Sequence, residues 1–289
     1  MLSIEPMGLE VPIEWSLPPS KSHMIRWLTL AAQAEGDTGL SFTGNAGKDV
    51  LSMVDCLREI GAVVDQNESR WVVSGVGLRG FRTPERNLDC GNSGTTARFL
   101  MAIAAGMSEP VTLDGDQSLR RRDMSALAGA LRELGCEVTS DTLPLTVTGP
   151  VVPGPAHLDV NDSSQPLSAL LLASPGYSGA IHLKTSLHSV SRGYSELSYE
   201  LAARCGSSNE RGSDGADIEP WRPVTPGEVK IPGELSLLPL AMLLAELHDV
   251  EVVLTGDDLE LSGSLMELAE RTEEDRKSTR LNSSHVKRS

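Results

Sequence analysis

The chain of 289 residues has few basic residues, few cysteines and no long hydrophobic run. It contains 25 lysines and arginines and 40 aspartates and glutamates, which gives a formal net charge of −15. General nucleic-acid binding needs a basic surface, so this balance argues against that class of function. No run is long enough to span a membrane, and the N-terminal residues lack the basic start and apolar core of a secretory signal.

The four cysteines lie far apart in the sequence and form no Cys-x-x-Cys pair. This spacing predicts buried, reduced thiols in a cytoplasmic protein rather than a disulfide framework. The six histidines show no paired metal-ligand spacing. We therefore expect neither a metal nor a cofactor, and an anionic ligand would need a local cluster of basic side chains in this acidic chain.

Short β-branched segments alternate with amphipathic segments, which predicts an α/β fold made of a repeated strand-helix-strand-helix-strand-strand unit. The predicted strands lie at 38–44, 70–76, 86–90, 110–115, 136–140, 143–149, 156–160 and 180–186. The predicted helices lie within 17–32 and at 49–61, 93–106, 124–135, 163–174 and 195–206. Ser22, Ser93 and Ser164 stand at three helix starts, spaced by 71 residues, and a fourth start follows near Leu235.

Basic residues accompany two of these helix starts. Lys21 and Arg26 lie in the first turns of one helix, and Arg98 lies one turn after Gly94 in another. Cations oppose the dipole at a helix N-terminus, which favours anions. These side chains therefore either point into water at a small cost or surround an anionic ligand. The serines by themselves are explained equally well as helix caps.

Two further segments carry groups suited to anions. Arg120, Arg121 and Arg122 precede a predicted helix, with Asp123 as its expected cap. This run is either a solvated charged loop or part of an anion site. The third helix start has hydroxyl and amide side chains that suit a phosphate group, and they belong to the consecutive residues Ser163, Ser164 and Gln165.

Five segments, in this order and spacing, resemble the 5-enolpyruvylshikimate-3-phosphate synthase family of enolpyruvyl transferases. They are PPSKSHMIR, LDCGNSGTTARFLMA, LDGDQSLRRRDM, SSQPLSALLLA and SVSRGYSE. The resemblance covers nearly all of residues 10–260. It implies repeated βαβαββ units in two domains, with the active site between them. Residues 17–223 would form a complete three-unit substrate-binding domain, and 1–16 with 224–274 would form part of the second domain.

The resemblance implies an activity: transfer of the enolpyruvyl group of phosphoenolpyruvate to the 5-hydroxyl of shikimate 3-phosphate, with release of phosphate. It also implies a cytoplasmic, monomeric enzyme of the shikimate pathway, without a cofactor and without nucleic-acid or membrane partners. Two alternatives stay open. One is the related enolpyruvyl transferase that acts on UDP-N-acetylglucosamine, and the other is a non-catalytic module that binds a phosphorylated ligand.

The resemblance also assigns residues. Lys21 is the expected catalytic residue of this chain and would contact both substrates. The expected shikimate 3-phosphate ligands are Lys21, Ser22, Arg26, Ser163, Ser164, Gln165, Ser191 and Tyr194. The expected phosphoenolpyruvate ligands are Lys21, Asn92, Gly94, Arg98, Arg122 and Gln165.

The sequence departs from the family pattern in several places. Asp123 replaces a proline after the arginine run, and Lys48 replaces an acidic residue. The family's catalytic aspartate and a set of basic residues belong to a part that this chain lacks, so we expect an inactive fragment. Residues 275–289 are basic and serine-rich and resemble the translation of a sequencing-adapter oligonucleotide, so we expect them to be a non-native tail.

Overall fold

The computed structural model describes residues 12–161, 163–185, 192–212, 215–248, 250–257 and 286–288. Among these residues, no helix has both the length and the apolar character needed to cross a membrane. The chain divides into two compact units. Unit 1 comprises Met1–Ser20, Phe42–Asn45 and Lys230–Ser289, and unit 2 comprises Lys21–Ser41 and Ala46–Val229.

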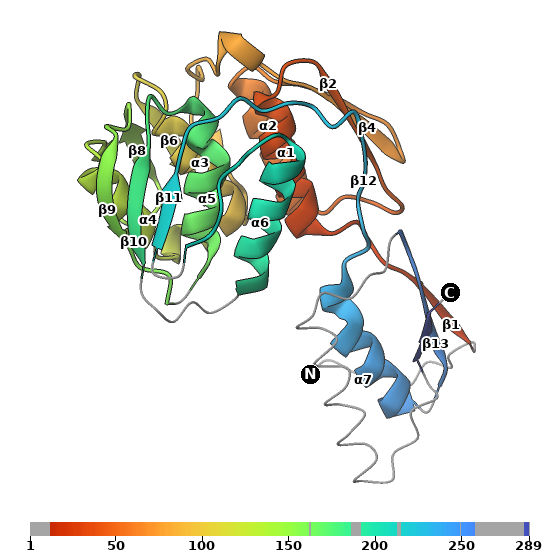
Figure 1. Cartoon of the computed structure of the whole chain (residues 1–289). Coiled ribbons are helices and arrows are strands. Elements are labelled where there is room, and N and C mark those ends of the chain that lie inside the picture. Colours follow the sequence, from red (N-terminus) through yellow and green to blue (C-terminus); the bar gives the residue numbers. More distant parts are fainter. Residues whose placement is uncertain are drawn as a thin grey trace. The chain divides into compact units, whose positions relative to one another are not determined.

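Unit 2 is a mixed α/β structure whose elements follow the predicted pattern (Figure 1). Its helices are α1 (Lys21–Gln33), α2 (Lys48–Glu59), α3 (Gly94–Ala104), α4 (Ser125–Glu133), α5 (Gln165–Ala173) and α6 (Arg192–Arg204). Its strands are β2 (Asp37–Ser41), β3 (Val63–Gln66), β4 (Arg70–Ser74), β5 (Leu88–Asp89), β6 (Val111–Asp114), β7 (Glu137–Val138), β8 (Leu145–Thr148), β9 (Gly154–Leu158), β10 (Ile181–Thr185), β11 (Gly215–Ile218) and β12 (Glu228–Lys230). Every predicted helix and strand of this region is confirmed, whereas β3, β11 and β12 were not predicted.

The strands form three sheets that share one order. The sheets run β12-β2-β4-β3, β5-β6-β8-β7 and β11-β10-β9. In the second sheet, α3 connects the parallel strands β5 and β6, and β8 pairs antiparallel with both β6 and β7. The third sheet repeats this arrangement, with β9 and β10 parallel across α5 and β11 antiparallel to β10. The second sheet therefore contains the complete βαβαββ unit predicted from the sequence, and the third contains its first five elements among the described residues.

The first sheet takes its first strand from the far end of unit 2. The strand β12 lies beside β2 in the position that β5 and β9 take in the other sheets. Residues 224–229 therefore belong to unit 2, although the predicted domain ends at 223. Leu17–Ser20 belongs instead to unit 1, because Leu17 packs in the core of that unit.

Three helices form the centre of unit 2. The helices α1, α3 and α5 contact one another, and α1 and α3 also pack against strands of their own sheets. In α5 every residue from Pro166 to Ala173 is buried, and in α1 every residue from Met24 to Gln33 is buried. A helix that is apolar on all sides is typical of a buried position, whereas α2 and α4 have one apolar face.

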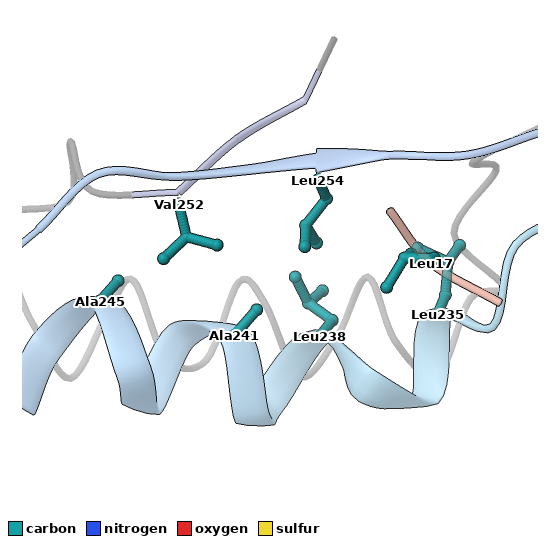
Figure 2. Packing of buried hydrophobic residues seen from close by; sticks show 7 residues of the cluster. All are labelled: Leu17, Leu235, Leu238, Ala241, Ala245, Val252 and Leu254. Atoms are coloured by element: carbon teal, nitrogen blue, oxygen red, sulfur yellow. The ribbon is translucent and has the colours of Figure 1, made fainter. Parts of the chain in front are cut away.

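Unit 1 is built around one helix and a small sheet. The strands β1 (Ile13–Ser16), β13 (Val252–Thr255) and β14 (Val286–Arg288) are parallel and lie in the order β1-β13-β14. The 3₁₀ turn η4 (Leu235–Leu237) leads into α7 (Leu238–His248). Figure 2 shows the core of this unit, in which small and aliphatic side chains of α7 face those of β13. Its buried members are Leu17, Leu235, Leu238, Ala241, Ala245, Val252 and Leu254.

The strand β14 lies within the segment 275–289, which the sequence sets apart as a tail without hydrophobic periodicity. The structure pairs these three residues with β13, with Val286 opposite Val252. Strand pairing uses backbone groups, so it does not require the side-chain periodicity that the segment lacks. Val286–Arg288 therefore take part in the sheet of unit 1, and the interpretation of 275–289 as a non-native tail stays a prediction.

The packing of the central helices predicts a large effect of Leu170→Ala. Leu170 of α5 is completely buried, so its truncation leaves a cavity and should lower the free energy of unfolding by about 3 kcal/mol. The matched control is Leu51→Ala in α2, where the leucine is 40% exposed and the expected loss is below about 1 kcal/mol. Urea denaturation followed by circular dichroism measures both values. Equal losses would contradict the central position of α5.

Candidate anion-binding site

The N-terminal ends of four helices of unit 2 are joined by side-chain contacts. Lys21 at the start of α1 forms an ion pair with Asp49 in the first turn of α2, with 3.1 Å between Nζ and Oδ2. The hydroxyl of Thr96 in α3 donates to the backbone oxygen of Asp49 at 3.3 Å. Arg98 of α3 donates through Nη1 to Oε1 of Gln165, the first residue of α5, at 2.9 Å. Four helix N-termini are therefore linked by side-chain contacts, and the partial positive charge at each of them favours an anion.

The start of α3 brings two guanidinium groups close to the backbone. Ser93 caps the helix, and its buried hydroxyl accepts from the backbone N–H of Thr96 at 3.2 Å. Gly94 follows, and a Cβ atom there would lie 2.9 Å from Nη1 of Arg98 and 3.2 Å from Nη1 of Arg122. Both distances are shorter than ordinary van der Waals contact, so a side chain at this position would push the arginines away. The glycine thus allows two cations to approach one helix N-terminus.

Arg98 keeps a positive charge without a carboxylate in contact with its guanidinium. It donates to the backbone oxygen of Gly94 at 3.2 Å, to Gln165 Oε1 at 2.9 Å and to the backbone oxygen of Asp123 at 2.7 Å. Burial, together with the neighbouring charge of Arg122, lowers the pKa of Arg98. Desolvation and repulsion between two cations are both relieved when an anion binds between them. This geometry favours the anion-site interpretation at this helix start.

Asn92 holds Arg122 in position. The side-chain oxygen of Asn92 accepts from Nη2 of Arg122, while its Nδ2 donates to Oδ2 of Asp116 at 2.6 Å. The backbone N–H of Leu119 also donates to Asp116, at 2.8 Å, and this bond and the Asn92 bond lower the pKa of the Asp116 carboxyl group. The carboxylate thus orients the amide, and the amide presents its oxygen to the arginine.

The arginine run divides into residues with different surroundings. Arg120 forms two hydrogen bonds with the carboxylate of Asp114, at 2.7 and 2.6 Å, and these bonds raise the pKa of Arg120. Arg122 is instead bonded to the neutral amide of Asn92. The charge of Arg120 is therefore neutralised within the chain, whereas that of Arg122 faces the start of α3. The solvated-loop interpretation fits Arg120, and the anion-site interpretation fits Arg122.

Arg26 is buried, which excludes the solvent-exposed one of the two settings expected from the sequence. Its side chain is 2% exposed, so it does not point into water. It donates to the hydroxyl of Ser198 at 2.8 Å and to the backbone oxygens of Ser22 and Tyr194, both at 3.0 Å. The rings of Phe99 and Tyr194 lie 5.6 and 5.9 Å from its guanidinium carbon. Burial lowers the pKa of Arg26 to about 10, so the side chain remains cationic at neutral pH.

The remaining predicted ligands lie at the start of α5 and in α6. The hydroxyl of Ser163 accepts from the backbone N–H of Gln165 at 3.1 Å. Ser164 occupies the cap position of α5 and is 2% exposed, but its hydroxyl makes no capping bond. The side chain of Tyr194 is 45% exposed, and Ser191 lies outside the described residues. Ser22 is the second residue of α1, whereas Ser93 and Ser164 each precede their helices.

The structure thus brings together most of the predicted residues. Asn92, Gly94, Arg98, Arg122 and Gln165 are connected by the contacts given above, and Lys21 joins them through Asp49. Ser22, Arg26 and Tyr194 form a second connected group. Among the described residues, no group of three or more His, Cys, Asp or Glu side chains is arranged to hold a metal ion.

Sequence reasoning missed two acidic residues of the site. Asp49 joins the starts of α1, α2 and α3, and Asp116 orients Asn92. An acidic residue in the first turn of a helix is ordinarily explained by the helix dipole, so Asp49 carried no distinguishing signal. Asp116 lies in the loop before Arg120, where a turn-forming residue is equally ordinary.

Comparison with known proteins identifies the family of the chain. A family model described as EPSP synthase (3-phosphoshikimate 1-carboxyvinyltransferase) matches residues 10–196. The 3-phosphoshikimate 1-carboxyvinyltransferase of Methanocorpusculum labreanum is 33% identical over 245 residues, which are 83% of this chain and 57% of that protein. The protein of that name from Novosphingobium aromaticivorans is 35% identical over 280 residues, 89% of this chain and 62% of that protein.

A solved structure has the same fold over most of the chain. The EPSP synthase of Acinetobacter baumannii superposes with a TM-score of 0.70 and 24% sequence identity, covering 83% of this chain and 54% of that one. At this identity the structural match bears on the fold alone. This chain therefore spans little more than half the length of the proteins that it matches.

The different surroundings of the arginines predict different effects on anion binding. Arg122→Ala should weaken the binding of inorganic phosphate about tenfold, because it removes a charge-assisted donor at the start of α3. Arg120→Ala should have a much smaller effect, since Arg120 is already paired with Asp114. Isothermal titration calorimetry measures both. Equal losses would mean that the arginine run acts only as a diffuse positive field.

Proposed function

Since this chain belongs to the EPSP synthase (3-phosphoshikimate 1-carboxyvinyltransferase) family, we propose that it takes part in enolpyruvyl transfer from phosphoenolpyruvate to the 5-hydroxyl of shikimate 3-phosphate. The reaction releases phosphate and belongs to the shikimate pathway of aromatic amino-acid biosynthesis. We place the protein in the cytoplasm, as a monomer that acts on these two small molecules without a cofactor.

One observation carries the proposal. The positive ends of α1, α2, α3 and α5 meet beside Arg98 and Arg122, and these elements lie within the residues that the family model matches. Both proposed substrates carry phosphate and carboxylate groups, which helix N-termini and arginines bind well. A net charge of −15 would repel such substrates, so the local cluster is what makes their binding favourable.

The phosphoenolpyruvate side of the proposed site is the group around the start of α3. Arg122 supplies a guanidinium held by Asn92, and Gly94 allows a ligand to approach the backbone N–H groups. Arg98 adds a second cation and orients the amide of Gln165. The amide nitrogen of Gln165 then remains as a donor toward either substrate.

The shikimate 3-phosphate side is the group around α1, α5 and α6. The hydroxyls of Ser163 and Ser164 lie at the start of α5, where they suit a phosphate. A guanidinium has five N–H donors, and the three bonds of Arg26 given above leave donors for a substrate carboxylate or hydroxyl. Tyr194 is held next to Arg26 through its backbone oxygen and presents an exposed ring. Ser22 and Ser191 complete the proposed set.

The chemistry accounts for the residue types. Charge develops on the addition intermediate between the two substrates, and fixed cations stabilise that charge most when they are already in position. Lys21 has the proposed catalytic role, with contacts to both substrates, and its ion pair with Asp49 orients the ammonium group. The resemblance assigns the catalytic aspartate to a part of the family sequence beyond the portion matched by this chain.

The binding of shikimate 3-phosphate tests the proposal. Calorimetric titration of the 289-residue chain should detect binding, and Lys21→Met should weaken it about tenfold through the loss of one charge-assisted hydrogen bond. The matched control is Lys48→Met, an exposed lysine at the start of α2, which should leave the affinity nearly unchanged. Equal effects of both changes would mean that Lys21 contributes only as a surface charge and does not contact the ligand.

The same titration separates the alternatives. Preferential binding of UDP-N-acetylglucosamine would indicate the related enolpyruvyl transferase. Equal affinity for unrelated phosphorylated metabolites would indicate a non-catalytic phosphate-binding module, and would overturn the proposed function.

A phosphate-release assay with both substrates addresses catalysis. We expect the 289-residue chain to bind shikimate 3-phosphate without turnover, because the residues that match the family do not include the proposed catalytic aspartate. Turnover at a rate typical of enzymes, on the order of 10 s⁻¹, would show that this chain contains a complete catalytic set.

A further inference from the structure

A cavity lies at the end of the central helices of unit 2 that is opposite the candidate anion site. It has a volume of about 440 Å³, and each helix contributes to its wall at or near its last residue. Those residues are Gln33 of α1, Ile103 of α3 and Ala173 of α5. The candidate anion site is at the N-terminal ends of the same helices, so roughly 16–20 Å of helix separate the two sites along α1 and α3. The cavity is therefore distinct from the site described above.

The helix ends at this cavity lack the usual compensating charge. The outer helices α2, α4 and α6 each have an arginine in the last turn, namely Arg58, Arg132 and Arg204. The central helices α1, α3 and α5 have no basic residue in the last turn. A helix C-terminus carries a partial charge of about −0.5, which lysine or arginine ordinarily offsets. Three helix C-termini without a basic residue in the last turn therefore end at one cavity, while some of their carbonyls, those of Ala32, Ala102 and Leu172, accept hydrogen bonds.

Acidic side chains add to this potential. Glu35 and Glu109 line the cavity, and Arg222 is the one basic residue of its described wall. Arg222 donates to the carboxylate of Glu35, and the side chains of both residues are more than half exposed. Glu109 forms no ion pair with any residue that the structure describes. The wall thus holds two carboxylates against one guanidinium, and the second carboxylate is available to a cationic ligand.

Gln33 offers a hydrogen-bond acceptor in the same wall. The residue is 8% exposed, and its Nε2 donates to the backbone oxygens of Thr29 and Leu172 at 2.9 and 2.8 Å. These two bonds fix the amide so that the nitrogen faces the helices. The Oε1 atom accepts no hydrogen bond from the described residues and is open to the cavity, since it is not among the buried atoms without a partner. An N–H donor from a ligand would take the place of water at this oxygen.

Apolar side chains form the rest of the wall. Phe81, Met107 and Trp221 line the cavity together with Val76. The indole N–H of Trp221 donates to the hydroxyl of Ser174 at 3.1 Å, which holds the ring in place. Aromatic faces suit both an apolar ligand body and a cation next to it. The volume lies within the range of sites for small organic molecules.

We propose that this cavity binds a small organic cation, an amine carried on an aromatic or aliphatic body. The ammonium group lies near Glu109 and donates to Oε1 of Gln33, at the negative helix ends. The apolar body packs against Phe81 and Trp221. The same negative potential rejects anions of equal size and lowers the affinity for neutral molecules.

A titration with three probes of matched shape tests the charge requirement. The probes are 2-phenylethylamine, 2-phenylethanol and phenylacetate, added to the ¹⁵N-labelled 289-residue chain. The four indole N–H signals, from Trp15, Trp27, Trp71 and Trp221, serve as reporters in ¹H–¹⁵N spectra, with Trp221→Phe identifying the signal of interest. We expect the amine to shift the Trp221 signal with a Kd of about 1 mM or lower. The alcohol and the acid should bind at least about fivefold more weakly.

Variants of exposed acidic residues test the location. Glu109→Gln should weaken amine binding about threefold, and Glu109→Lys about tenfold, by removing or reversing one charge. Glu68→Lys, in the exposed turn between β3 and β4, makes the same charge change elsewhere and should leave the affinity unchanged. Unchanged dispersion of the spectra confirms that the variants are folded. Equal binding of the three probes, no shift of the Trp221 signal, or equal effects of Glu109→Lys and Glu68→Lys would each overturn the proposal.

Discussion

The packing of α1, α3 and α5 against one another is the constraint on which the rest of unit 2 depends. The helices are buried along most of their lengths, so their apolar side chains are removed from water on all sides. Contacts at both ends show that they run in the same direction. Arg98 bonds to Gln165 where α3 and α5 begin, and Gln33 bonds to the backbone oxygen of Leu172 where α1 and α5 end. Three aligned helix dipoles then produce one positive and one negative end of the bundle.

The positive end explains how this acidic protein presents a candidate site for anions. The N–H groups of the helix starts cannot bond within their own helices, and Gly94 keeps side-chain atoms away from them. The acidic residues nearby do not remove this positive potential, because each of them interacts mainly with one basic residue. Asp114 neutralises Arg120, Asp49 pairs with Lys21, and Asp116 acts on Arg122 through the amide of Asn92 and less strongly through its charge. The site is thus assembled by neutral groups that place cations, which is suited to substrates with phosphate and carboxylate groups.

At the negative end, the central helices have no basic residue in the last turn, although carbonyls of α3 and α5 accept hydrogen bonds from Tyr177 and Gln33. By contrast, an arginine lies in the last turn of each outer helix, α2, α4 and α6. The buried amide of Gln33 and the carboxylate of Glu109 lie at the same end. The helix bundle therefore has a candidate anion site at its N-terminal end, and its C-terminal end has the negative potential that suits a cation.

The sequence by itself determined the local structure and the types of residue in the site. Periodicity located the helices and most strands, since each depends on a face that must be buried over a few turns or residues. The spacing of Ser22, Ser93 and Ser164, with basic residues near the first two, indicated helix starts that share an anion, and the motifs identified the family. Only the tertiary structure decided the rest, because it depends on contacts between distant segments. The pairing of β12 with β2, the burial of Arg26 beneath Tyr194 and the separate partners of Arg120 and Arg122 are such contacts. The cavity at the helix C-termini is another such feature, because its wall comes from helix ends that are about seventy residues apart in the sequence. A local pattern of side chains does not show that segments so far apart lie close together in space.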